Sequence, residues 1–130
     1  KGNPGPGGWG VVLADDEDTE QKSGSVPQTT NNRMEIMAAI EGLLMLPSGS
    51  EVQVFTTSDY VFQGVTKWIH GWRRRSWLKR GGKPVANADL WQALDKLMEQ
   101  YTVRWINAKG QDIAELDDAS KLATSAVDVV

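Results

Sequence analysis

The sequence has 130 residues, of which 40% are apolar and 24% are charged, enough for one domain with a single core and too short for two. It contains no cysteine and a single histidine, His70. These counts exclude a disulfide scaffold, a thiolate metal site, a cysteine nucleophile and a multi-histidine zinc site. The sequence shows neither a long apolar run nor a basic-then-apolar leader, so we predict no membrane span and an intracellular protein.

The formal net charge of −3 conceals an uneven distribution of charge. Residues 61–100 contain eight lysines and arginines against three acids, a net charge of +5, and the rest of the chain is acidic. A cationic segment inside an acidic chain indicates a polyanionic partner better than the total charge does. The chain also opens in a turn-like Gly/Pro segment, with no predicted element before it.

The hydrophobic pattern predicts eight elements in the order strand–strand–helix–strand–helix–helix–strand–helix, in which the first two strands form an antiparallel hairpin. A chain of this order belongs to the mixed α/β class. The predicted ranges are, in chain order, 9–13, 20–26, 35–46, 52–56, 59–68, 88–100, 103–107 and 112–126.

Short polar residues precede three of these helices and are predicted to cap them, because their side-chain oxygens can accept from the free N–H groups of a first turn. Asn31 or Asn32 is expected to cap the first helix, at the end of a loop over residues 27–32. Ser58 and Asn87 are expected to cap the next two helices.

A basic segment rich in tryptophan follows the second predicted helix, from residue 68 to residue 80. Guanidinium groups pair with phosphates, indole rings pack on sugars and bases, and each neutralised phosphate releases counterions. The alternative interpretation is that tryptophans at helical spacing are core residues and that the arginines only confer solubility. The residues predicted to contact nucleic acid are Trp68, Trp72, Arg73, Arg74 and Arg75.

Three further patterns have both a functional and a structural interpretation. The Gly/Pro segment contains Asn3, which can contact a ligand or belong to a simple turn. The polar cluster over residues 29–35 can bind an anion at a helix start or merely cap the helix, with Glu35 one turn inside. Scattered carboxylates can converge on divalent ions for phosphodiester hydrolysis or lie exposed in solvent. These carboxylates are Glu35, Asp59, Asp112, Asp117 and Asp118.

Taken together, these segments resemble type 1 ribonuclease H of the bacterial kind, which has a basic protrusion. The resemblance implies an α/β fold with a ribonuclease H-like mixed five-stranded sheet and flanking helices, in a single domain over residues 1–130. It also implies that the first strand of the family, which lies in the middle of the sheet, is absent from this chain. The matching stretches are Gly2–Gly10, Thr30–Ala39, Tyr60–Val61, Gln63–Val65, Trp68–Trp72, Lys83–Trp91, Val103–Trp105 and Lys109–Gly110.

The family cleaves the RNA strand of RNA–DNA hybrids with two Mg²⁺ ions held by four carboxylates. By resemblance, Glu35 is the catalytic and metal-binding carboxylate that this chain retains. Thr57 and Ser120 stand where the family has two others, and the remaining one belongs to the absent strand; Asp59 and Asp118 are further metal candidates. One carboxylate cannot hold two Mg²⁺ ions against their hydration. We therefore expect the chain to be inactive or very weak, with Mg²⁺ or Mn²⁺ as the cofactor if it is active.

The parts of the family that bind the hybrid match better than the catalytic parts. By resemblance, Asn3, Asn31 and Asn32 contact the minor groove and the 2′-hydroxyls that distinguish RNA from DNA. The tryptophans and arginines of the basic segment correspond to the DNA-strand channel and the protrusion. The leading hypothesis is a domain that binds RNA–DNA hybrid or duplex. The alternatives are a non-catalytic module of a larger nucleoprotein assembly and an acidic domain whose Trp/Arg segment contacts only protein.

The absent strand has a structural consequence of its own. Without it, the family's sheet would have two unpaired edges and a slot in the core, at a cost larger than the stability of about 5–15 kcal/mol of a typical domain. Three explanations follow. The sequence is part of a longer chain, another chain completes the sheet, or residues 126–130 replace the strand.

Overall fold

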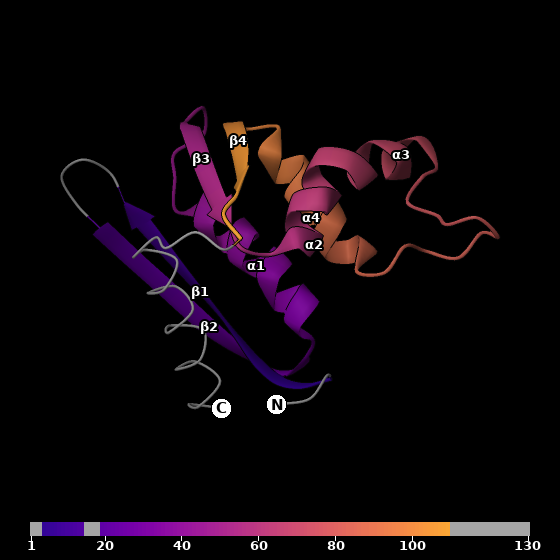
Figure 1. Ribbon diagram of the computed structural model, residues 1–130, viewed down its shortest axis with the longest axis horizontal. Coiled ribbons are helices and arrows are strands. Elements are labelled where there is room, and N and C mark those ends of the chain that lie inside the picture. The colour runs from indigo at the N-terminus through magenta and orange to yellow at the C-terminus, as the bar shows by residue number, and fades with distance from the viewer. Residues whose placement is uncertain (1–3, 15–18, 110–130) are drawn as a thin grey trace.

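The computed structural model describes residues 4–14 and 19–109, and the fold begins with a long hairpin (Figure 1). Strands β1 (Gly5–Ala14) and β2 (Thr19–Thr29) pair antiparallel. Trp9 lies opposite Gly24, where a Cβ atom would come within 2.6 Å of the indole ring. Because Gly24 has no side chain, the indole ring of Trp9 fits against it. The predicted hairpin is confirmed, and both strands are longer than the predicted ranges 9–13 and 20–26.

Helix α1 (Asn31–Leu44) starts two residues after β2. Its N-cap is Thr30, whose extended backbone lets the side-chain hydroxyl accept from the N–H of Arg33 at 3.2 Å. The prediction that Asn31 or Asn32 is the cap was wrong, because both residues already belong to the helix. The predicted loop over residues 27–32 is also wrong, since β2 continues to Thr29.

Strand β3 (Glu51–Thr56) leads into one continuous helical segment in three parts: α2 (Asp59–Gln63), η1 (Gly64–Trp68) and α3 (Ile69–Arg74). Ser58 accepts from the N–H of Val61 at 3.1 Å, which confirms it as the cap of α2. The middle turn, η1, is a π-helix. Helical structure therefore continues six residues beyond the predicted end and includes the first two arginines of the basic segment.

Helix α4 (Ala88–Met98) precedes strand β4 (Thr102–Asn107), which pairs parallel with β3. Asn87 occupies the N-cap position of α4, as predicted. The predicted capping bond is wrong, because the side chain of Asn87 accepts from no N–H group of the first turn. Its backbone is left-handed, with φ of 61°, and the amide donates to the hydroxyl of Tyr60 instead. The helix predicted over residues 112–126 and the segment 126–130 lie outside the described residues.

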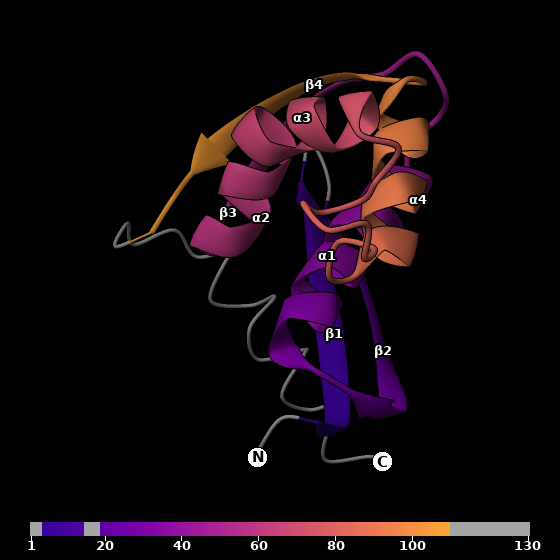
Figure 2. The ribbon, with the colours of Figure 1, turned by 90° about the vertical axis from the view of Figure 1, so that its right-hand side faces the viewer.

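The four described strands form two separate sheets, β1–β2 and β3–β4. No ladder joins β1 to β3 within the described ranges, so these residues do not form the expected five-stranded sheet. The mixed α/β class is confirmed. Figures 1 and 2 show the hairpin extending away from the β3–β4 pair, with α1 beside it and α4 beside α1.

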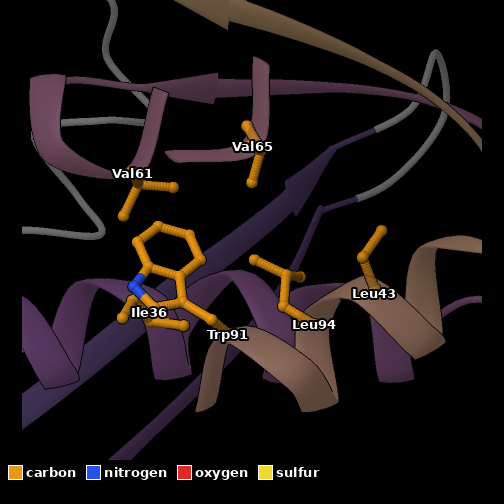
Figure 3. Packing of buried hydrophobic residues seen from close by; sticks show 6 residues of the cluster. All are labelled: Ile36, Leu43, Val61, Val65, Trp91 and Leu94. Carbon is orange, nitrogen blue, oxygen red and sulfur yellow. The ribbon is translucent and has the colours of Figure 1, made fainter. Parts of the chain in front are cut away.

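The core lies between α1, α4 and the α2–η1 segment (Figure 3). The indole of Trp91 is fully buried and points between the valines of α2 and η1 and the isoleucine of α1. Burying a large aromatic side chain removes about 150–250 Å² from water, so Trp91 is a major source of the hydrophobic stability of this core. The cluster consists of Ile36, Leu43, Val61, Val65, Trp91 and Leu94.

Replacing Gly64 with Ala is expected to destabilise the protein by at least about 1–3 kcal/mol, because overpacking a filled core forces backbone and side chains to shift. A Cβ atom at Gly64 would lie 2.1 Å from the Trp91 ring. Gly71→Ala is the matched helical control, since its Cβ would meet only the guanidinium of Arg75, at 3.0 Å. Chemical denaturation measures both variants; equal stabilities for Gly64→Ala and the wild type would contradict the packing argument.

Candidate functional site

Glu35 lies on α1, and its carboxylate is exposed at the carboxyl end of β3. Its Oε2 accepts from the hydroxyl of Ser58 at 2.6 Å, and Ser58 follows β3 by two residues. The same hydroxyl caps α2, so one serine links Glu35 to the strand end and to the next helix. Ligands of open α/β sheets bind outside the carboxyl ends of the strands. Glu35 therefore occupies a position from which it can contact a bound ligand.

Asp59 is the other predicted metal candidate within the described residues, and its carboxylate accepts hydrogen bonds from two side-chain amides. The Oδ1 of Asp59 accepts from Asn107 at 3.3 Å and from Gln63 at 3.4 Å. The described ranges contain no group of three or more His, Cys, Asp or Glu side chains placed to hold a metal ion. Asp118 and Asn3 lie outside those ranges. The described residues thus do not fit a centre for two divalent ions, which needs several converging oxygens.

The predicted tryptophans belong to a series of ring contacts that continues into the core. Trp68 contacts the rings of Tyr60 and Trp72, each at a centroid distance of 5.9 Å. Trp72 packs in turn on Trp91, at 5.4 Å, and on Trp77, at 6.1 Å. Trp72 thus packs among three other indole rings, and its contact with nucleic acid stays a prediction. Trp68 remains 40% exposed and can offer its ring to a ligand.

The three consecutive arginines have different environments. Arg73 donates to both carboxylate oxygens of Asp95 on α4, with two of these bonds at 2.9 Å. This pairing holds the pKa of Arg73 above its ordinary value. Arg74 and Arg75 are exposed and have no ion-pair partner within the described part of the chain. The charge of Arg73 is thus largely compensated by Asp95, whereas no described residue forms an ion pair with Arg74 or Arg75.

The last residue of α3 and the loop that follows it carry most of the remaining positive charge, and we call residues 74–84 the basic loop. It projects from the body of the molecule in Figure 1. A bridge between Leu78 and Pro84 closes its base, and Gly81 and Gly82 make the tip with positive φ angles of 90° and 85°. The loop contains no acid, and its cations are exposed. They are Arg74, Arg75, Lys79, Arg80 and Lys83.

Sequence reasoning missed a polar network that joins the starts of α1, α2 and α4. Arg33 donates to Asp89 at 2.7 and 3.0 Å and to the Oδ1 of Asn87 at 3.2 Å. The hydroxyl of Tyr60 accepts from Asn87 at 2.9 Å and from Trp91 at 3.1 Å. The hydrogen bonds from Arg33 hold the pKa of Asp89 below its ordinary value of 3.8. The network fixes Asn31 and Asn32, two exposed predicted contact residues, relative to α4.

Comparison with known proteins gives a consistent result. The profile of a family described as RNase H matches residues 1–127. A relative from Erythrobacter litoralis named ribonuclease H is 48% identical over 130 residues, which cover 99% of this chain and 90% of the relative. Within the described residues, no helix is long and apolar enough to cross a membrane.

Two solved structures share the fold. The crystal structure of LC9-RNase H1, described as a type 1 RNase H with the type 2 active-site motif, superposes with a TM-score of 0.82 at 30% identity. The match covers 99% of this chain and 67% of that one. LC11-RNase H1 in complex with RNA/DNA hybrid has a TM-score of 0.64 at 24% identity, with coverage of 99% and 91%, and shows the likeness of fold alone.

Asp89→Asn is expected to make the Tm less dependent on pH under acidic conditions. A carboxyl whose pKa is lowered by folding stabilises the protein above its unfolded-state pKa, and this contribution is lost as the pH falls through the folded-state pKa. The wild-type Tm should therefore fall more steeply than that of the variant below about pH 4. The pair is exposed, so the difference is at most about 1 kcal/mol. Circular dichroism melts measure it, with Glu51→Gln as control; parallel profiles would contradict the prediction.

Proposed function

Because the chain belongs to the ribonuclease H family, we propose that it binds RNA–DNA hybrid or a related duplex. The observation that carries this proposal is the basic loop, whose cations have no ion-pair partner among the described residues, on an otherwise acidic protein. Cations that neutralise phosphates release counterions and so favour a polyanionic ligand. The choice of ligand is supported by LC11-RNase H1, a protein of the same fold that was crystallised in complex with RNA/DNA hybrid.

The proposed roles of the predicted residues follow from their environments. Arg74 and Arg75 contact phosphates, since nothing in the described part of the protein compensates their charge. Arg73 acts as a positioning residue, because its bond to Asp95 fixes the end of α3 to α4. Trp68 packs its exposed ring on a sugar or base. Asn31 and Asn32, and by resemblance Asn3, contact the groove and its 2′-hydroxyls.

For catalysis, we propose that this 130-residue chain is inactive or very weak. Support comes from the surroundings of Glu35, to which the described residues contribute one side-chain partner, the hydroxyl of Ser58. Thr57 supplies a hydroxyl where the family has a carboxylate. If Mg²⁺ or Mn²⁺ binds, Glu35 would be a ligand, with Asp59 and Asp118 as further candidates. Divalent ions supply an activated water and charge stabilisation in such reactions.

A second candidate is a non-catalytic module that serves as a binding or structural part of a larger nucleoprotein assembly. The lone Glu35 carboxylate favours this interpretation, because the proposed binding residues are present while metal ligands do not gather within the described ranges. We also propose that residues 1–130 belong to one domain and that a strand outside the described residues completes the sheet. The unjoined edges of β1 and β3 support this last point.

Arg74→Ala and Arg75→Ala are each expected to weaken hybrid binding and to reduce the slope of log K against log salt by about 1. Arg73→Ala should instead lower the Tm and leave most of this slope unchanged, because Asp95 already compensates its charge. Arg104→Ala, an exposed arginine on β4, is the control. Fluorescence anisotropy over a salt series measures binding; affinity independent of salt would overturn the nucleic-acid proposal.

Glu35→Gln is expected to leave hybrid cleavage unchanged at background level, with Mg²⁺ or with Mn²⁺. The amide oxygen of glutamine can still accept from Ser58, so the variant should keep the Tm and the hybrid affinity of the wild type. A labelled hybrid separated on a denaturing gel measures cleavage. Metal-dependent cleavage by the wild type that disappears in Glu35→Gln would establish an enzyme and overturn the non-catalytic proposal.

A further inference from the structure

Tyr60 on α2 is linked to two separate groups of the residues proposed to contact nucleic acid, and we propose that it is a positioning residue that couples them. One group is the pair of exposed asparagines in the first turn of α1, and the other is the exposed ring of Trp68. This role rests on the proposed binding of hybrid and adds a residue that acts through its neighbours and touches neither strand.

The hydroxyl of Tyr60 is linked to the start of α1 through a side chain that precedes α4. The hydroxyl accepts from the Nδ2 of Asn87 at 2.9 Å, and the Oδ1 of the same amide accepts from Arg33 at 3.2 Å. Asn87 thus directs its donor to one neighbour and its acceptor to the other, which fixes the orientation of the amide. Arg33 follows Asn32 directly, so this chain of hydrogen bonds ends in the turn that carries the asparagines.

The ring of Tyr60 is linked to the tryptophans. It meets the ring of Trp68 edge-on, with a centroid distance of 5.9 Å and an interplanar angle of 64°. Aromatic pairs prefer such geometry because the edge of one ring is attracted to the face of the other. Within the described residues, the other ring contact of Trp68 is Trp72. A shift of the tyrosine ring therefore changes the face that Trp68 offers to a ligand.

Two donors share the Tyr60 hydroxyl, and this makes it sensitive to a single substitution. The second donor is the N–H of Trp91, at 3.1 Å, and Trp91 is fully buried. Without the hydroxyl, the donors of Asn87 and Trp91 regain partners only if α2 and α4 shift or water enters. Such a shift moves the start of α1 relative to Trp68 and changes no charge.

The test compares Tyr60→Phe with Tyr101→Phe in the 130-residue chain. Tyr101 is the matched control, because its hydroxyl also makes one hydrogen bond, of 3.0 Å to the carbonyl of Leu46, beyond the other end of α1. Tyr60→Phe is expected to lower the preference for hybrid over DNA duplex of the same sequence by about 3–10-fold, the equivalent of one hydrogen bond. The groove contacts that distinguish the 2′-hydroxyl need alignment, whereas phosphate contacts depend on charge.

Fluorescence anisotropy with both duplexes over a salt series measures this preference. The slope of log K against log salt should equal that of the wild type in both variants, because neither substitution removes a charge. Asp89→Asn provides a second variant if Tyr60→Phe does not fold, since it breaks the bonds between Arg33 and Asp89 at the other end of the chain. Its lost negative charge raises affinity for both duplexes, and their ratio should still fall.

A double-mutant cycle measures the coupling itself. Asn32→Ala and Trp68→Ala are expected to be non-additive in the wild type, so that the double variant binds hybrid at least about 2-fold better than the product of the two single losses. In the Tyr60→Phe background, the same two substitutions should become additive. A residue that only stabilises the fold would lower the Tm and leave this interaction between distant side chains unchanged.

Three outcomes in a wild type that binds hybrid would overturn the role of Tyr60 alone. They are equal wild-type affinity for the two duplexes, an equal change of preference in Tyr60→Phe and Tyr101→Phe, and an additive cycle in the wild type. Wild-type affinity for hybrid that does not depend on salt would overturn the proposed function and this role with it, so the two failures are distinguishable.

Discussion

Burial of Trp91 is the constraint on which the rest of the described structure depends. The ring is fully buried and fills the space that Gly64 leaves by having no side chain, and η1 begins at that glycine. The indole N–H of Trp91 donates to the hydroxyl of Tyr60, which also accepts a hydrogen bond from the side-chain amide of Asn87. A single side chain thus sets the distance between α4 and the α2–η1 segment, and a polar network continues from it to the start of α1.

The network and the core position the proposed binding surface without belonging to it. Arg33 and Asp89 fix the end of α1 that carries the exposed asparagines, and Arg73 and Asp95 fix the end of α3 before the basic loop. These arginines lie on the same basic and polar stretches as the proposed contact residues, but internal ion pairs compensate their charge. Within the described residues, intramolecular pairing therefore separates the cations that stabilise the fold from those without an ion-pair partner.

Much of the fold could be predicted from sequence, because local patterns fix local structure. The hairpin, the helix that Ser58 caps, and the strands β3 and β4 follow from alternation, turn residues and capping chemistry. The caps at Thr30 and Asn87 were mispredicted, since neighbouring polar residues satisfy the same local rule and only the backbone angles choose between them. The π-helical form of η1 and the continuation of the helix through α3, beyond residue 68, also escaped prediction, because apolar periodicity does not distinguish these turns from an ordinary helix and its end.

By itself, the sequence determined the family, the α/β order of elements and the cationic segment. Tertiary structure decided which of three adjacent arginines is neutralised, because Asp95 lies 22 residues from Arg73 and only helix packing brings them together. It also decided that the described strands form two separate sheets, β1–β2 and β3–β4. Periodicity reports which side of an element is apolar, and it carries no information on which distant element covers that side.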